Sequence, residues 1–560
     1  MNYIKPITVF KLLLFLVFTF MINSTIRSQV KNEEVTVVAA YEPSLSDAHK
    51  ININPEIEVK AIDKPDLKYS ITPSLLNTTF EPTKITAARV SGEPLSKLYQ
   101  SYIRAGFGNY ITPYAELFYN NLRSRTYNLG VNYKHYSSLG KIKDYTPSSF
   151  SDNALNIYGS YFSENHIFTG DFLYNRNAFH YYGFTPLADY NTDSPGKATF
   201  QKYQTLEVSA SIKSNYTDKE KLYHTADIKF YNLKNSAIVE NGLCIKANLS
   251  KNVDLVSKLE NQKLSVDAAV NYYNNPGFSP TKDASVYMVK PQASFGMNQY
   301  ALNIGLNVNV AAGADSYIRF FPVIEGRIAI DKDVLSLYGS FSGNIERNNI
   351  RALYEENPFI ITNFDSLKFT ENKIIFKGGI KGSIASVFAF NIGAGYKESN
   401  NMPFFVNDTT GLFNKFTLIY DDVTIANIFA DFSLQTADNL LLMLRGEFRH
   451  YSMNAEEEPW HKPSLNASII AEYKLVDKIN IKAEIYAQGN TYAKLYNASK
   501  KVISQDIKGF ADFNLGLEYL YNKKISAFLN LNNIAGTRYY QWYNYPSQRF
   551  HVLGGLTYAF

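Results

Sequence analysis

The sequence predicts an all-β protein, a transmembrane antiparallel β-barrel of about 22 strands. Stretches of about ten residues alternate strictly between apolar and polar positions, which is the length that a tilted strand needs to cross a bilayer. The 560 residues include 43 Tyr and 38 Phe but only 19% charged residues, a composition that suits one large β structure. A single long apolar run lies near the start of the chain and is typical of a secretion signal.

That apolar run, ITVFKLLLFLVFTFMIN, lies beside Lys5 and Lys11 and ends in small polar residues. We interpret residues 1–28 as a signal peptide, with Ser28 at the cut and Gln29 at the mature end. The lone cysteine, Cys244, can form no intramolecular disulfide, and it is predicted to be a buried or lipid-facing thiol. A net charge of +5 without a basic run gives no support for nucleic-acid binding.

Residues 29–97 differ in composition from the rest of the chain. Six prolines are scattered through short polar stretches of this segment, at positions 43, 55, 65, 73, 82 and 94. Such a sequence predicts an extended periplasmic or luminal segment with one or two short strands. The barrel is then formed by residues 98–560.

The alternation is clearest between Ile479 and Gln488, where Ile and Ala occupy one face and Asn, Lys, Glu, Tyr and Gln the other. Period alone does not distinguish a lipid-facing strand from a strand of a soluble sandwich. The secretion signal, the strand length and the way the chain ends favour the membrane barrel, and hence the outer membrane of a Gram-negative bacterium.

The pattern contains 23 candidate strands, but a barrel with both ends in the periplasm needs an even number. The short polar connections are predicted to be periplasmic; they lie near Ser124, Glu164, Lys219, Ser257, Gln299, Lys332, Ala385, Asp438, Asp477 and Lys523. The longer connections are then extracellular. The two sets alternate only if the stretch FTLIYDD, residues 416–422, belongs to an extracellular loop, which leaves 22 strands.

Three segments resemble known sequence patterns, one an insertion signal and two a receptor family. The last strand, RFHVLGGLTYAF, places Tyr558 and Phe560 on one apolar face, and it resembles the insertion signal that the barrel assembly machinery recognises. The segment NLNNIAGTRYYQWYNYPSQRFHVLGGLTYAF is similar to the end of TonB-dependent receptors, whose barrels have 22 strands. The segment EEVTVVAA, from Glu33 to Ala40, resembles the Ton box of those receptors; the residues concerned are Glu33, Glu34, Val35, Thr36, Val37, Val38 and Ala39.

The resemblance implies a role in uptake, with an energy-coupling periplasmic protein that pairs with this segment by strand addition. A β-prone extended tail is the alternative interpretation of the same residues. The chain departs from the family in one respect, because about 70 residues before the barrel leave no room for a standard plug of well over a hundred. The lumen of such a wide barrel must then be filled by residues 29–97, by extracellular loops folded inward, or by a separate protein.

Seven charged residues are predicted to face the lumen, namely Arg445, Glu447, Arg449, Lys482, Glu484, Asp512 and Glu518. They form either a binding or selectivity surface or a wall of mutually paired charges, and we favour the wall. The acidic run Glu456–Glu458, followed by Trp460 and His461, is either a cation site or a solvated loop, and we favour the loop.

The aromatic clusters AFHYYGF (178–184) and RYYQWYNYP (538–546) are either stacking platforms for ligands or loop packing, and we favour packing. The sequence contains no nucleophile motif, nucleotide-binding loop or zinc spacing, so it predicts no enzyme, catalytic residue, metal or cofactor.

Two functions fit these observations. The first is transport of a substrate across the outer membrane, with outer-membrane lipids and an energy-coupling protein as partners. The second is a plugless structural or assembly subunit that scaffolds a complex, for example with a surface lipoprotein. The Ton-box-like segment favours transport, whereas the missing plug favours the scaffold. We rank transport first because the fold is so often used for it.

Overall fold

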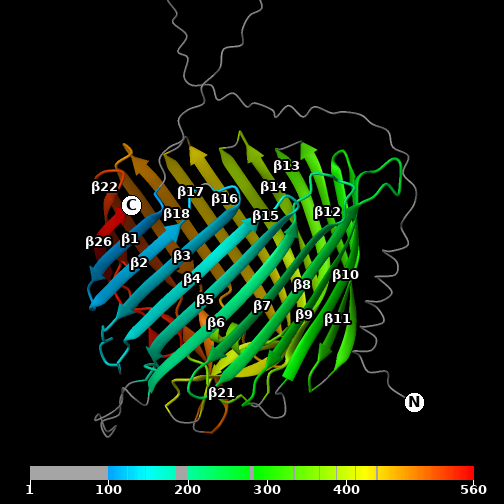
Figure 1. Ribbon diagram of the computed structural model, residues 1–560. Coiled ribbons are helices and arrows are strands. Elements are labelled where there is room, and N and C mark those ends of the chain that lie inside the picture. Colours follow the sequence, from blue (N-terminus) through cyan, green and yellow to red (C-terminus); the bar gives the residue numbers. More distant parts are fainter. Residues whose placement is uncertain are drawn as a thin grey trace, which may run out of the picture. The chain divides into compact units, whose positions relative to one another are not determined.

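The structure, a computed structural model, describes residues 99–560 except 123, 146, 185–198, 278–282, 315, 332–333, 365, 386, 410–411, 437–438 and 498. These residues form one antiparallel sheet of 22 strands that closes into a barrel (Figure 1). No helix among them is long and apolar enough to cross a membrane.

The barrel strands are β1 (Ser101–Gly108), β2 (Thr112–Asn120), β3 (Tyr127–Ser138), β4 (Phe150–Phe162), β5 (His166–His180), β6 (Phe200–Ser214), β7 (Tyr223–Lys234), β8 (Val239–Asn252), β9 (Glu260–Asn274), β10 (Asp283–Met297), β11 (Tyr300–Ala312), β12 (Tyr317–Asp331), β13 (Leu335–Arg347), β14 (Phe369–Ile384), β15 (Phe388–Asn407), β16 (Phe416–Thr436), β17 (Leu440–Met453), β18 (Leu465–Leu475), β19 (Ile479–Gln488), β22 (Phe510–Leu520), β23 (Ile525–Asn532) and β26 (His551–Ala559). Among the described residues, the connections contain two hairpins and one helix, namely β20 (Thr491–Tyr496) with β21 (Val502–Ile507), β24 (Tyr540–Trp542) with β25 (Tyr545–Pro546), and α3 (Ile350–Glu356).

The first and last strands close the sheet. β1 pairs with β2 along one edge and with β26 along the other, and Ile103 lies opposite Tyr558 in the second ladder. Every strand therefore has two neighbours, so no edge is left with unpaired backbone groups in the bilayer. The prediction of a closed barrel of 22 strands is confirmed.

The two faces of each strand follow the predicted alternation. Leu444 and Phe448 of β17 and Ile428 of β16 are exposed apolar side chains on the outer face, with 40%, 47% and 61% of their surface accessible. The intervening Arg445 and Glu447 point to the lumen and bind luminal partners. An apolar outer face and a polar inner face are what a barrel in lipid requires.

The connections divide as the sequence predicts. Ten turns, and the chain's C-terminus beside them, lie at the upper end in Figure 1. The lower end carries the long connections, such as residues 348–368 and 533–550, together with a few short ones. Short periplasmic turns and longer extracellular loops are the rule for outer-membrane barrels, so the lower end in Figure 1 is the extracellular end.

One prediction is wrong. The stretch FTLIYDD is not an irregular loop but the first third of β16, and it pairs with the last residues of β15 from Met402 to Asn407. The two strands have 21 and 20 residues, and a register shift between Ser399 and Met402 lets their ladder continue. FTLIYDD extends the following strand into the single long strand β16 and does not form a strand of its own. The count of 22 strands is therefore unchanged.

The connection between β13 and β14, residues 348–368, folds into the barrel at its extracellular end. We call this segment the cap. Its helix α3 contacts β6 and β8, and its residues 359–361 pair with Phe416 at the start of β16. In a ring of 22 strands, β6–β8 and β15–β16 lie on nearly opposite sides. The cap therefore spans the lumen.

Candidate functional site

An apolar core holds the cap in place. Ile350, Leu353, Ile360, Phe364 and Leu367 of the cap are all 5% accessible or less. They form one cluster with inward-facing residues of the wall and of the last extracellular loop, namely Tyr203, Tyr231, Leu233, Ile238, Phe405, Phe416, Trp542 and Tyr545. Burial of each large apolar side chain contributes about 1.5–3 kcal/mol relative to exposure in water. The cap is thus packed like a small protein core.

Polar contacts fix the start of α3 to the wall. Glu240 at the beginning of β8 is fully buried, and its carboxylate accepts the backbone N–H groups of Ile350 (2.8 Å) and Arg351 (3.0 Å). The same carboxylate accepts the Tyr231 hydroxyl at 2.9 Å. The Arg351 guanidinium pairs with Glu207 of β6. These contacts satisfy backbone donors that a helix leaves free at its N-terminus.

The last extracellular loop, residues 533–550, contacts the cap from another direction. Tyr545 stacks on Phe359 of the cap, with ring centroids 3.6 Å apart, and Trp542 lies 5.4 Å from Phe416. His461, from the loop after β17, lies beside Trp542 (5.3 Å) and is buried. Burial lowers the pKa of His461 to about 4, so this ring is neutral at pH 7. The loops and the cap form one packed unit.

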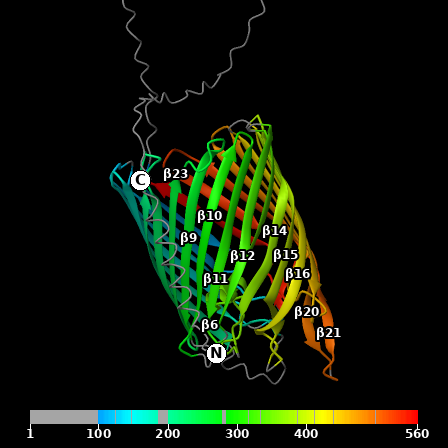
Figure 2. The ribbon, with the colours of Figure 1, turned by 90° about the vertical axis from the view of Figure 1, so that its right-hand side faces the viewer.

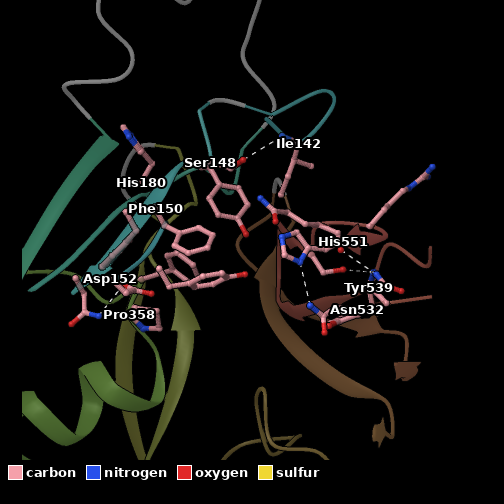
Figure 3. Close-up of a pocket in the computed structure, with 18 of the residues that line it drawn as sticks. Ile142, Ser148, Phe150, Asp152, His180, Pro358, Asn532, Tyr539 and His551 are labelled. Atoms are coloured by element: carbon pink, nitrogen blue, oxygen red, sulfur yellow. Dashed lines mark hydrogen bonds between the residues drawn. The ribbon is translucent and has the colours of Figure 1, made fainter. Parts of the chain in front are cut away.

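A cavity of about 650 Å³ lies between this unit and the arc of wall that runs from β22 through β26 and β1 to β5. Figure 3 shows Phe150 and Asp152 on one flank, Asn532, Tyr539 and His551 on the other, and Pro358 of the cap below. The volume falls in the range of sites that hold small organic ligands. This cavity is the candidate ligand site.

The cavity lining combines aromatic and polar side chains. Tyr539 donates its hydroxyl to Asp512 (2.7 Å) and stacks on Phe510 with ring centroids 3.9 Å apart. Burial, together with the hydrogen bond to Asp512, raises the pKa of Tyr539 above its usual range. On the opposite flank, Asn177 donates to Asp152 at 2.9 Å. The Tyr539 hydroxyl therefore stays protonated, and the two carboxylates are oriented by neutral donors.

The predicted luminal charges lie on the inner face but are not one cluster. Arg449 pairs with Glu447 (2.5 Å) and Lys482 with Glu484 (2.7 Å). Arg445 instead pairs with Asp431 of β16 at 2.6 Å, an interaction that needs the strand register. The two remaining residues accept hydroxyl groups, Asp512 from Tyr539 and Glu518 from Ser526. Only Asp512 lines the 650 Å³ cavity; Lys482 and Glu518 line a second one of about 450 Å³ that begins near Arg104 and Asn439.

The acidic run is not simply a solvated loop. Glu456 accepts the Trp460 indole N–H at 2.8 Å and pairs with Lys494 of β20 at 2.6 Å, whereas Glu457 is exposed. Trp460 and His461 are buried. Burial, with repulsion from Asp506 and Glu457, raises the pKa of Glu458. Among the described residues, no group of three or more His, Cys, Asp and Glu side chains is arranged to hold a metal ion.

The aromatic clusters largely serve loop packing. Tyr181 is buried and donates its hydroxyl to the carbonyl of Ile360 (2.7 Å), while Trp542 and Tyr545 belong to the cap core. Phe179, Tyr182 and Tyr539 from the same two clusters line the candidate site. Sequence reasoning identified the clusters but missed the cap aromatics Tyr354 and Phe359, which face the same cavity.

Cys244 departs from its prediction. It is half-buried on β8 opposite Lys229, whose amine pairs with the luminal Glu207. The register therefore places the thiol on the inner face rather than against lipid. At the end of the chain, Tyr558 and Phe560 are exposed on the outer face with their rings 5.7 Å apart. The signal peptide, residues 29–97 and the Ton-box-like residues Glu33–Ala39 lie outside the described residues.

No protein-family model matches the sequence, and no curated protein matches it. The fold, in contrast, is similar to solved receptor structures. The pyoverdine outer membrane receptor FpvA from Pseudomonas aeruginosa PAO1 is 12% identical, with a TM-score of 0.63 over 83% of this chain and 79% of the receptor. The FrpB iron transporter from Neisseria meningitidis is 10% identical, with a TM-score of 0.63 over 83% and 82%. The siderophore receptor PirA from Acinetobacter baumannii is 8% identical, with a TM-score of 0.62 over 84% and 81%.

At these identities the likeness concerns the fold, and the functions of the three neighbours remain statements about those proteins. All three are receptors or transporters. The similarity in fold to these barrels agrees with three features of this chain, namely the closed sheet of 22 strands, the apolar outer face and the turns at the end where the chain's C-terminus lies. The chain therefore has the fold of the outer-membrane receptor and transporter barrels, a closed antiparallel barrel of 22 strands.

Proposed function

We propose that this barrel is an uptake receptor that binds a small substrate at its extracellular end and passes it through the lumen. The observation that carries the proposal is the 650 Å³ cavity between the cap and the wall, because an inward-folded loop creates a concave, ligand-sized site where substrate arrives. The polar inner face below it offers a hydrated route.

Passage of a substrate requires the cap to move. The cap contacts nearly opposite sides of the ring, so it obstructs the lumen while Glu240 and Glu207 hold α3. We propose that substrate binding or energy input from the periplasm releases these contacts. The energy-coupling partner binds Glu33–Ala39 by strand addition, outer-membrane lipids cover the outer face, and the barrel assembly machinery reads Tyr558 and Phe560.

Single-channel conductance of the full chain in planar bilayers tests this proposal. Arg347 and Phe369 are direct partners in the β13–β14 ladder, so a two-residue Asn-Gly turn can replace residues 348–368 without disturbing the register. The full chain is expected to conduct little, and the cap deletion to open a large, stable pore. A second deletion, of residues 30–97, measures what that segment adds to closure. A cap deletion that stays closed would overturn the gating role of the cap.

One observation favours the second candidate function, a scaffold for a surface partner. The β20–β21 hairpin projects beyond the extracellular end of the barrel (Figure 2) and carries the exposed side chains Tyr496 (46%) and Ile503 (43%). Gentle purification from native outer membranes, with and without Asn497–Lys501 and the adjoining strand ends, distinguishes the functions. A stable lipoprotein that is lost with the hairpin supports the scaffold, whereas a bare barrel supports the receptor.

A further inference from the structure

The charge on the cavity lining is negative. Asp152 from β4, Asp512 from β22 and Glu355 from the cap supply three carboxylates, and Arg549 supplies the one lining guanidinium. Glu355 is bound by Arg351 at 2.8 Å. Asp152 and Asp512 have no ion-pair partner within 4.0 Å among the described residues. Asp152 lies on the flank opposite Tyr539 (Figure 3), and Tyr539 donates its hydroxyl to Asp512. The site therefore favours a ligand with more than one positive charge and disfavours an anion.

Aromatic side chains from the wall, the loops and the cap also line the cavity. The lining rings are Tyr136, Phe150, Phe179, Tyr182, Tyr354, Phe359 and Tyr539. Aromatic rings bind the apolar faces of cyclic ligands, and they also attract cations through the ring quadrupole. An aliphatic polyamine would use the carboxylates but would leave most of these rings uncovered.

Two lining side chains have buried polar atoms without a hydrogen-bond partner within the described part of the chain. One is Asp512 Oδ1, an acceptor, and the other is Nε2 of His551, a residue that is 6% accessible. Asn532 donates to His551 Nδ1 at 3.2 Å, which leaves the ring proton on Nε2 as a donor. Buried polar groups are nearly always satisfied by protein, water or ligand. A ligand that reaches both atoms must therefore offer both a hydrogen-bond donor and an acceptor.

We propose that this cavity binds a cationic, hydroxylated ring compound of the amino-sugar class. Ammonium groups pair with Asp152 and Asp512, hydroxyl groups supply donors and acceptors to the polar lining, and the sugar faces stack on the aromatic rings. This inference names the substrate class of the receptor site and so rests on the proposed function. The volume of about 650 Å³ accommodates two to three sugar rings.

A matched pair of ligands isolates the charge. Isothermal titration of the full chain in detergent, at pH 6.5 and low ionic strength, compares a glucosamine trimer with its fully N-acetylated and therefore neutral counterpart. The variants are Asp152→Asn and Asp512→Asn. The control is Asp171→Asn, which removes a luminal carboxylate of β5 that does not line the cavity.

The amine form is expected to bind at least about tenfold more tightly than the acetylated form, because hydrogen bonds to charged groups contribute about 1.5–3 kcal/mol. Each site variant weakens its binding about 10- to 100-fold, the control leaves it unchanged, and added salt weakens it. Equal affinity for the two trimers, no binding of either, or equal losses in the site and control variants would each overturn the inference. If the two trimers bind equally and Tyr539→Ala abolishes the binding of both, the cavity is still a ligand site but not one selective for charge. The conductance experiment uses no ligand and therefore tests the gating role of the cap separately.

Discussion

The contact between Glu240 and α3 gives the sharpest test of how the cap is held. Replacing Glu240 by Ala removes the acceptor of two backbone N–H groups, at 2.8 and 3.0 Å, and of the Tyr231 hydroxyl at 2.9 Å. Two of these donors and the acceptor lie in a dry environment, since Ile350 and Glu240 are 0% accessible and Tyr231 is 7% accessible, whereas Arg351 is partly buried. The closed cap loses one of its two N-terminal anchors and keeps the Arg351–Glu207 pair, whereas an opened cap has these donors in water.

The magnitude follows from the cost of buried donors without partners, which is about 1–3 kcal/mol each. The three costs are not additive, and the variant no longer buries a carboxylate, so we take about 3 kcal/mol for the closed state. Because about 1.4 kcal/mol corresponds to a factor of ten, the ratio of open to closed caps should rise roughly 100-fold. Glu240→Gln keeps one acceptor oxygen, and its effect should be intermediate.

Limited trypsin cleavage after Arg351 measures this ratio directly. The Arg351 side chain is 19% accessible and bound to Glu207 in the closed cap, so cleavage reports the open population when opening and closing are fast. The matched control is Glu355→Gln in the same helix, whose carboxylate is 59% accessible. An exposed pair of this kind contributes less than about 0.5 kcal/mol. Cleavage of Glu240→Ala at the wild-type rate, or an equal increase in Glu355→Gln, would refute the role of Glu240.

Three further predictions concern the loops and the chain end. The pKa of His461 is about 4 in the closed loops and near 6.5 in an opened state; the open state therefore binds the proton first, and closure weakens by up to about 3 kcal/mol as the pH falls from 6.5 to 4. Conductance at pH 7 and 4.5 should show this opening, and the His461→Phe variant should not open at pH 4.5. Opening that persists in His461→Phe would contradict the role of His461 and would point to the neighbouring Lys462–Glu356 pair. Glu456→Ala leaves Lys494 and the Trp460 indole without their carboxylate and should destabilise the β20–β21 hairpin by about 2 kcal/mol; faster hydrogen exchange at Tyr492 and Lys494 checks it, and unchanged exchange would contradict it. Removal of Phe560 should slow barrel insertion, measured by the heat-modifiable gel shift, whereas Phe550→Ser on the same outer face should not.

Much of the barrel can be predicted from the sequence because each strand carries its own information. Alternation assigns the inner face, and pairs two residues apart on one face are then neighbours, as Glu447 with Arg449 and Lys482 with Glu484 are. The partner of Arg445 could not be predicted in this way. Asp431 comes from the adjacent strand, and its position opposite Arg445 depends on the register of the β16–β17 ladder.

The predictions for the loops are wrong where a long-range contact decides the structure. The Glu456–Glu458 run has the composition of a solvated loop, yet Lys494 folds back from the β20–β21 hairpin to pair with Glu456 across 38 residues. FTLIYDD has the composition of a strand, and it forms one, but counting alone could not show that β15 and β16 simply continue together. Local propensity gives the type of structure, whereas the partner decides where it lies.

The inward fold of the cap does leave a signal in the sequence, in the inner face of the strands that receive it. On β7 the inner face changes from Asp227 and Lys229 to Tyr231 and Leu233 towards the extracellular end, and on β6 it changes from Glu207 to Tyr203. A water-filled lumen keeps its inner face polar along its whole length, and buried apolar side chains there require a protein partner. The depth at which the inner face turns apolar therefore marks where the barrel is filled from within. Here that depth lies at the extracellular end, where the cap packs against these rings, so among the described residues the cap is the segment that fills this end of the lumen.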